Sequence, residues 1–173
     1  PRINGVDQSP GKGFKARHTT FQNDKNRAVF SADISDAYPT ESRVGSWTRK
    51  YILEKNKAFK ISDQYKLVEL KDETTSLNFM TCLRAGLKKP GTIQLEKENT
   101  KLSVHYDEKL LEPKLEFIEV TDEKLKQFWP DGLTRLVFYV KNKKLIEEIT
   151  IEISPLRNRR NTFYKKERSI KSK

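Results

Sequence analysis

The chain has 173 residues, of which 35% are apolar and 34% charged, and its formal net charge at pH 7 is +11. This length predicts one domain that folds without disulfides or metal, because a chain of this size buries roughly 70% of the surface that it exposes when unfolded. No apolar run approaches the roughly 20 residues that span a bilayer. Cys82 is the only cysteine, which excludes an internal disulfide and a cysteine-rich zinc site.

The N-terminal end shows no signal peptide and begins with Pro1 instead of Met. We therefore expect an excised or processed fragment of a longer protein. Under that expectation, the missing signal says nothing about where the parent protein is located.

Residues 1–13 are rich in Gly, Pro, Asn and Ser, which predicts a loop. From Phe14 onward, apolar and polar residues alternate with a period of two, as in strands with one buried and one solvated face. This alternation predicts strands at 28–34, 47–53, 59–67, 77–83, 93–95, 102–106, 115–120, 136–140 and 145–153. The turn residues at 55–57 predict that the strands at 47–53 and 59–67 form a hairpin. Cys82 lies among apolar residues and is expected to be a small buried side chain.

One segment, residues 121–128, departs from the alternation. A capping residue is followed by helix formers, and Pro130 ends the segment, so we predict a short helix of one or two turns.

These elements predict an all-β fold, an antiparallel β-sandwich of about nine or ten strands with one short helix. A parallel sheet is excluded because the connections are too short for crossover helices. The alternation alone does not distinguish a sandwich from a barrel such as the OB-fold.

Basic residues are concentrated at the C-terminal end. Residues 155–173 hold eight lysines and arginines and one acid, a net +7 of the total +11, which leaves +4 for residues 1–154. Such a tail favours polyanion contact through phosphates, sulfates or carboxylates, with a solvated, frayed terminus as the alternative. Phe163 and Tyr164 add aromatic rings to this charge, a composition that also occurs in single-strand nucleic-acid binders. We predict a β-sandwich at 1–154 and a basic tail at 155–173.

The sequence contains few groups that could carry out chemistry. His18 and His105 have no neighbour at metal-ligand spacing. No phosphate-binding glycine loop and no nucleophile elbow occur. Asp33 and Asp36 lie near Tyr38, and turn capping is the role we assign to them. We therefore predict no catalytic residue and no metal ligand in this chain.

Arg49 falls on the strand face that Trp47 and Tyr51 share, the face predicted to be buried. A buried guanidinium must be paired, because an unpaired charge in a low dielectric is very costly. The candidate partners are Asp33, Asp36 and Asp63, and contact with an anionic sugar is the alternative.

Several segments together resemble the C-terminal β-domain of heparinase II/III-like polysaccharide lyases. They are INGVDQ at 3–8, GFKA at 13–16, FSADISDAYP at 30–39, VGSWTR at 44–49, ISDQY at 61–65 and LNFMT at 77–81. The similarity lies in their order and spacing. It covers roughly residues 1–154 and leaves the tail unexplained.

The resemblance implies a parent enzyme with an α/α toroid before the β-sandwich, which cleaves acidic, uronic-acid-containing polysaccharides by β-elimination. It implies catalytic Tyr and His or Asn residues in the toroid. Some members also hold zinc through His and Asp, and none of these positions has a match here, so we expect no cofactor in this fragment. The implied partners are the preceding toroid and the polysaccharide, in the periplasm or outside the cell. We expect no membrane insertion and no nucleic-acid binding.

Under this hypothesis the fragment is inert by itself, supports the toroid and lines the substrate cleft. Asn4, Gln8 and Arg49 are the candidate substrate-binding residues, although Asn4-Gly5 is also a standard turn dipeptide. A stand-alone binding module for acidic glycan or nucleic acid, and a purely structural interaction domain, are the alternatives.

Overall fold

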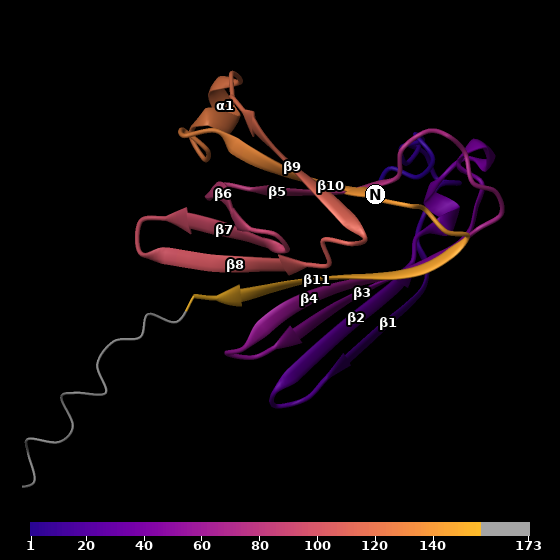
Figure 1. Cartoon of the computed structure of the whole chain (residues 1–173), viewed down its shortest axis with the longest axis horizontal. Helices are drawn as coiled ribbons and strands as arrows, with labels where there is room; N and C mark the ends of the chain where they lie inside the picture. Colours follow the sequence, from indigo (N-terminus) through magenta and orange to yellow (C-terminus); the bar gives the residue numbers. More distant parts are fainter. Residues whose placement is uncertain (157–173) are drawn as a thin grey trace, which may run out of the picture.

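The computed structural model describes residues 1–156 (Figure 1). Its helices are α1 (Glu123–Lys126) and the single 3-10 turns η1 (Ser35–Ala37) and η2 (Thr40–Ser42). The strands are β1 (Arg17–Asn23), β2 (Arg27–Asp33), β3 (Val44–Glu54), β4 (Ala58–Leu67), β5 (Ser76–Thr81), β6 (Arg84–Lys89), β7 (Thr92–Lys97), β8 (Thr100–Tyr106), β9 (Leu111–Ile118), β10 (Leu133–Val140) and β11 (Ile146–Pro155). No helix in this part of the chain has the length and apolarity to cross a bilayer.

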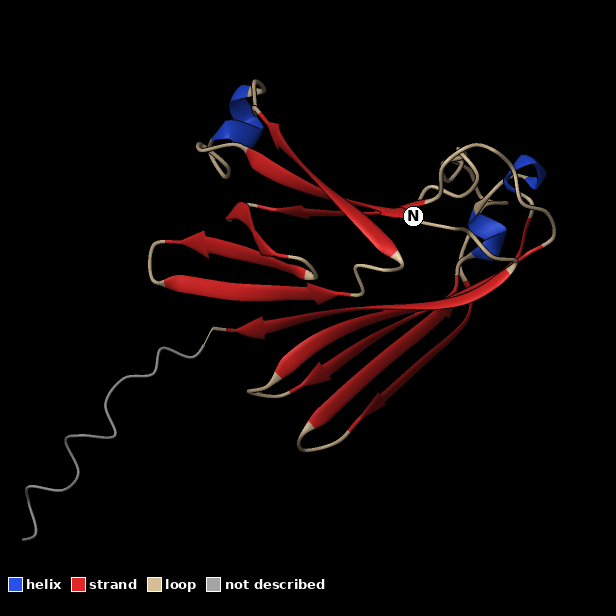
Figure 2. Ribbon diagram, viewed as in Figure 1, coloured by secondary structure: helices blue, strands red, loops and turns tan. Residues whose placement is uncertain are grey.

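The strands form two antiparallel sheets (Figure 2). The larger sheet has eight strands in the order β1-β2-β3-β4-β11-β8-β7-β6, and the smaller has the order β5-β10-β9. Because β11 pairs with both β4 and β8, it joins β1–β4 and β6–β8 into one sheet. The predicted fold class, an all-β antiparallel sandwich with one short helix, is confirmed.

The hairpin of β3 and β4 follows from the sequence as expected. Trp47 pairs with Tyr65 and Arg49 with Asp63, so these four side chains share the inner face. Asn56 adopts a positive φ of 61° at the turn, a conformation that Asn tolerates better than most residues. The outer face carries charged and polar residues, so this hairpin has one buried and one wet side.

The core lies between the two sheets. Phe138 of β10 is fully buried and makes edge-on ring contacts with Phe79 of β5 and Tyr106 of β8, with centroid separations of 6.0 and 5.2 Å. The small sheet therefore packs over the middle of the large one. In Figure 1, the far ends of β1–β4 extend away from β5, β9 and β10.

The structure adds two strands to the predicted set, β1 and β6. β1 lies at one edge of the large sheet, all of its residues are exposed, and Phe21 is its only large apolar residue. β6 was missed because Leu87 is its only large apolar residue, and that side chain is 57% exposed at the edge of the sheet. The helix prediction is confirmed in part: Asp122 caps α1 by accepting hydrogen bonds from the backbone N–H groups of Lys124 and Leu125. The predicted tail lies, after Leu156, outside the described residues.

Candidate functional site

A cluster of polar groups is buried where β3 meets β4. The Asp63 carboxylate accepts two hydrogen bonds from the Arg49 guanidinium, both 2.8 Å long, and a third from the Trp47 indole N–H at 2.6 Å. Tyr65 stacks on Trp47 with ring centroids 4.6 Å apart. The Arg49 Cζ lies 5.7 Å from the centre of the Phe79 ring, so the small sheet covers the cluster.

The electrostatics of this cluster require the pair to stay together. Burial opposes the charge on Arg49, but the hydrogen bonds and charge of Asp63 outweigh it and leave the pKa of Arg49 raised. Asp63 is fully buried and Arg49 only 8% exposed. Removing either partner would leave the other charge buried in a low dielectric without a counter-charge. The predicted buried pair is thus confirmed, with Asp63 as the partner.

The other two candidate partners serve elsewhere. Asp33 accepts hydrogen bonds from the backbone N–H and the hydroxyl of Ser35, so its predicted role in the turn is confirmed. Asp36 pairs with Arg17 at the surface. Within residues 1–156 the contacts of the Arg49 guanidinium are internal ones, and its contact with substrate stays a prediction.

Asn4, the second candidate, is only 2% exposed. It forms a tight turn with Gly5, in which both residues have positive φ and Ile3 pairs with Val6, as in a type I′ turn. Its side-chain amide donates to the carbonyls of Ser42 and Glu69, at 3.0 and 3.1 Å. In this structure its role is to hold three loops together, and a contact with substrate stays a prediction.

Lys143 completes the same network, and sequence reasoning missed it. Its Nζ donates to the Asn4 side-chain oxygen at 3.2 Å and to the carbonyls of Lys71 and Glu73. Burial lowers the pKa of Lys143, although Glu73 and Asp72 oppose that shift. No local pattern could reveal this lysine, because its partners lie about 70 and 139 positions away in the chain.

Gln8 is exposed in the N-terminal loop. Its side chain lies next to the hydroxyl of Tyr38, a group that also senses the charges of Arg49 and Asp63. Burial raises the pKa of Tyr38, with Arg49 opposing that shift. The structure therefore brings Gln8 and Arg49 near one buried phenol, whereas Asn4 makes its contacts with a different set of loops.

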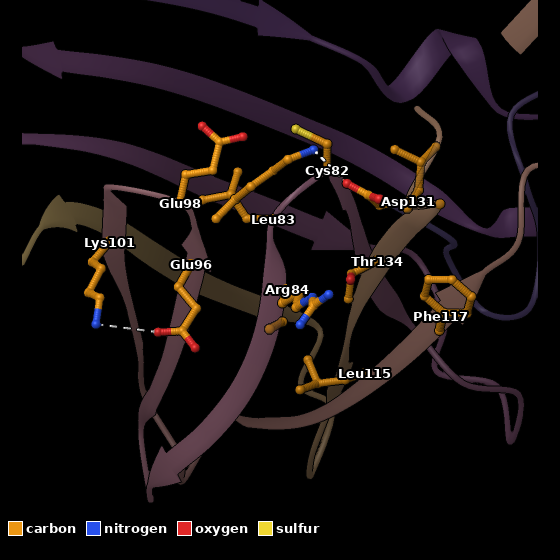
Figure 3. A pocket seen from close by; sticks show the side chains of 14 residues that line it. Cys82, Leu83, Arg84, Glu96, Glu98, Lys101, Leu115, Phe117, Asp131 and Thr134 are labelled. Carbon is orange, nitrogen blue, oxygen red and sulfur yellow. Dashed lines mark ion pairs between the residues drawn. The ribbon is translucent and has the colours of Figure 1, made fainter. Parts of the chain in front are cut away.

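A cleft with a volume of about 970 Å³ is lined by residues of both sheets (Figure 3). Its walls come from the β5–β6 turn, the β7–β8 hairpin, β9 and the segment before β10. Lys97 pairs with Asp131 at 3.1 Å and Lys101 with Glu96 at 3.7 Å. Figure 3 shows Arg84 between Glu96 and Thr134. Cationic and acidic groups are thus mixed and partly neutralised, and no histidine lines the cleft.

Cys82 lines this cleft and is exposed, so its prediction as a buried side chain was wrong. The strand in which it was placed ends at Thr81, and Cys82 begins the turn into β6. His18 and His105 are both exposed. Across residues 1–156, no three His, Cys, Asp or Glu side chains converge as a metal site would require. These residues do not fit a zinc ion of the kind that the resemblance implies for some lyases.

The fold is similar to that of part of a polysaccharide lyase. Heparan sulfate lyase HepC from Pedobacter heparinus superposes with a TM-score of 0.58 at 15% identity, over 85% of this chain and 22% of the lyase. A mutant of that enzyme gives 0.54 at 13% identity, over 82% and 22%. This chain thus spans about a fifth of the lyase. No family model and no curated protein matches the sequence.

Proposed function

We propose that residues 1–154 form the non-catalytic β-domain of a heparinase II/III-like polysaccharide lyase. The parent enzyme would cleave uronic-acid-containing polysaccharides by β-elimination, and this domain would support the α/α toroid and line the substrate cleft. The observation that carries the proposal is the fold similarity to heparan sulfate lyase HepC, of which this chain matches only a part.

The chemistry of the described residues supports a non-catalytic role. β-Elimination needs a base that removes the proton next to the carboxylate, and a donor or cation that neutralises that carboxylate. In residues 1–156 the buried cation Arg49 is already paired with Asp63, and both histidines are exposed. The reacting groups would therefore come from the toroid, and secretion or a periplasmic location would give the enzyme access to its polymer.

The complete reading frame that encodes these residues tests this proposal. We expect this reading frame to encode an α-helical toroid before Pro1. The complete protein should release unsaturated oligosaccharides from heparan sulfate or another uronate polymer, measured by ultraviolet absorbance. The 173-residue chain alone should release none, although it should bind the polymer. A reading frame without the toroid, or product release by the chain alone, would contradict the proposal.

The alternative function is a stand-alone module that binds acidic glycan or nucleic acid. The charge of the segment after residue 154 favours it, since this segment carries +7 of the net charge. Retention on a heparin column that disappears when residues 157–173 are deleted would indicate plain electrostatic attraction, with a steep salt dependence.

A further inference from the structure

A row of aromatic side chains crosses four neighbouring strands of the large sheet. Phe21 of β1 pairs with Phe30 of β2, and Phe30 pairs with Tyr51 of β3. Phe59 of β4 lies opposite Leu53, diagonally next to Tyr51. The ring centroids of Phe30 and Tyr51 are 6.2 Å apart, and those of Tyr51 and Phe59 6.1 Å apart, with interplanar angles of 30° and 18°. The rings of Phe30, Tyr51 and Phe59 therefore stack in one aromatic row, and the strand register places Phe21 next to Phe30 at its β1 end.

The aromatic row lies on the inner face of the sheet but beyond the cover of the small sheet. Phe21 is 66% exposed, Phe30 39% and the adjoining Leu53 43%. By contrast, Trp47 and Tyr65, on the same face of β3 and β4, are at most 1% exposed. A contiguous apolar surface that faces solvent indicates a binding site more often than a scattered set of apolar residues does.

Cations lie along one side of the aromatic row. The tips of the β1–β2 and β3–β4 hairpins carry Lys25, Arg27, Lys55 and Lys57. None of the four is in an ion pair with a carboxylate of residues 1–156. The two acids in these turns are already engaged: Asp24 accepts the backbone N–H groups of Asn26 and Arg27, and Glu54 pairs with Lys60.

A cleft of about 440 Å³ lies between the two tips, lined by Asn26, Arg27, Glu54, Lys55 and Lys57. Phe59 is two residues from Lys57 along β4, roughly 7 Å at the rise of a strand. The tip cleft therefore lies beside the aromatic row, with Lys57 next to Phe59.

We propose that the aromatic row and the tip cleft together bind one strand of an acidic polysaccharide. Pyranose rings present apolar C–H faces, which pack against aromatic side chains, and their sulfates or carboxylates would reach Lys55 and Lys57 in the tip cleft. This inference rests on the proposed function for the choice of ligand and assigns that ligand to an exposed surface whose Tyr51 neighbours Arg49, and not to the buried Arg49–Asp63 pair itself.

Binding of a heparan sulfate oligosaccharide to the full 173-residue chain, measured by calorimetry at several salt concentrations, tests this assignment. Phe21→Ser combined with Phe30→Ser should weaken binding about tenfold, a loss of about 1.4 kcal/mol shared between the two aromatic contacts. Lys55→Gln combined with Lys57→Gln should weaken it by a similar factor and also flatten its salt dependence.

Two matched controls distinguish binding by the aromatic row and tip cleft from the effect of removing any exposed ring or charge. Phe128→Ser removes an aromatic ring that is 75% exposed in the distant β9–β10 connection. Lys88→Gln combined with Lys89→Gln removes two exposed charges at the opposite edge of the sheet. Both should bind within twofold of the unmodified chain, with the tail present throughout.

The outcomes distinguish failure of the aromatic-row assignment from failure of the proposed function. If the chain binds and the aromatic-row variants bind as tightly as the controls, the assignment of the ligand to the aromatic row is overturned. Lyase activity of the complete protein would still support the proposed function. If a single-stranded oligonucleotide binds as tightly and is equally sensitive to the row variants, the glycan assignment is overturned. If the chain does not bind the glycan at all, the assignment to the aromatic row is overturned. The proposed function is then tested by the complete reading frame and the activity of the protein that it encodes.

Discussion

The two ends of the same strands behave differently. Near the small sheet, the inner face of β3 and β4 carries Trp47 and Tyr65, both at most 1% exposed. Toward the hairpin tips, the same face carries Tyr51 and Leu53, of which Leu53 is 43% exposed. The alternation of the sequence decides which face a side chain takes. The covering layer decides whether that side chain is buried.

The largest expected effect lies in the covered region. Asp63→Ala leaves the Arg49 guanidinium buried without its partner and removes the acceptor of the Trp47 indole N–H. We expect the free energy of unfolding to fall by about 3–5 kcal/mol, as measured by chemical denaturation.

A compensated variant sharpens this prediction. Replacing both partners, as Arg49→Leu with Asp63→Leu, should recover most of the loss, because no unpaired charge then remains buried. If Asp63→Ala alone unfolds at the same denaturant concentration as the unmodified chain, the assigned role of the Arg49–Asp63 pair is wrong.

Two leucines on the inner face of the β3–β4 hairpin compare the regions directly. Leu67 is 2% exposed in the covered region, and Leu53 is 43% exposed beside the aromatic row. Leu67→Ala should cost about 2–5 kcal/mol, since it leaves a cavity in the core, whereas Leu53→Ala should cost less than about 1 kcal/mol. Equal losses would mean that the two ends are covered alike in solution.

Asn4 tests the loops that close the covered end. Asn4→Ala removes the amide donor to the carbonyls of Ser42 and Glu69 and the acceptor of Lys143, and should lower the free energy of unfolding by about 1–3 kcal/mol. Because Asn4 has a φ of 48°, Asn4→Gly separates the lost hydrogen bonds from backbone strain. Asn78→Ala, at an exposed position of β5, is the control, with an expected change within about 0.5 kcal/mol.

The sequence predicted the features that depend on local alternation. The fold class, the β3–β4 hairpin and the burial of Arg49 all follow from which residues share a strand face. The network of Asn4 and the exposure of Cys82 were not predictable in this way. Asn4 contacts residues 38, 65 and 139 positions away, and the exposure of Cys82 depends on where β5 ends and how the chain crosses from one sheet to the other.

The smallest expected effect, at neutral pH, concerns the hydroxyl of Tyr65. This group is buried and has no hydrogen-bond partner within residues 1–156; the Lys144 backbone lies near it without reaching hydrogen-bond geometry. Burial first and the charge of Glu147 second raise the pKa of Tyr65 to about 12. Tyr65→Phe should therefore leave stability at neutral pH within about 1 kcal/mol of the unmodified chain, or raise it slightly.

At high pH the two proteins should separate. Below pH 10 the phenol of Tyr65 is protonated in both the folded and the unfolded chain, since 10.0 is its ordinary pKa. Between pH 10 and about 12 the unfolded chain loses this proton while the folded chain keeps it, so the unmodified protein loses stability as the pH rises. Tyr65→Phe lacks this loss, and the difference between the two denaturation midpoints should grow across that window. A difference that stays constant with pH would mean that solvent reaches the hydroxyl, and hence that the covered end opens.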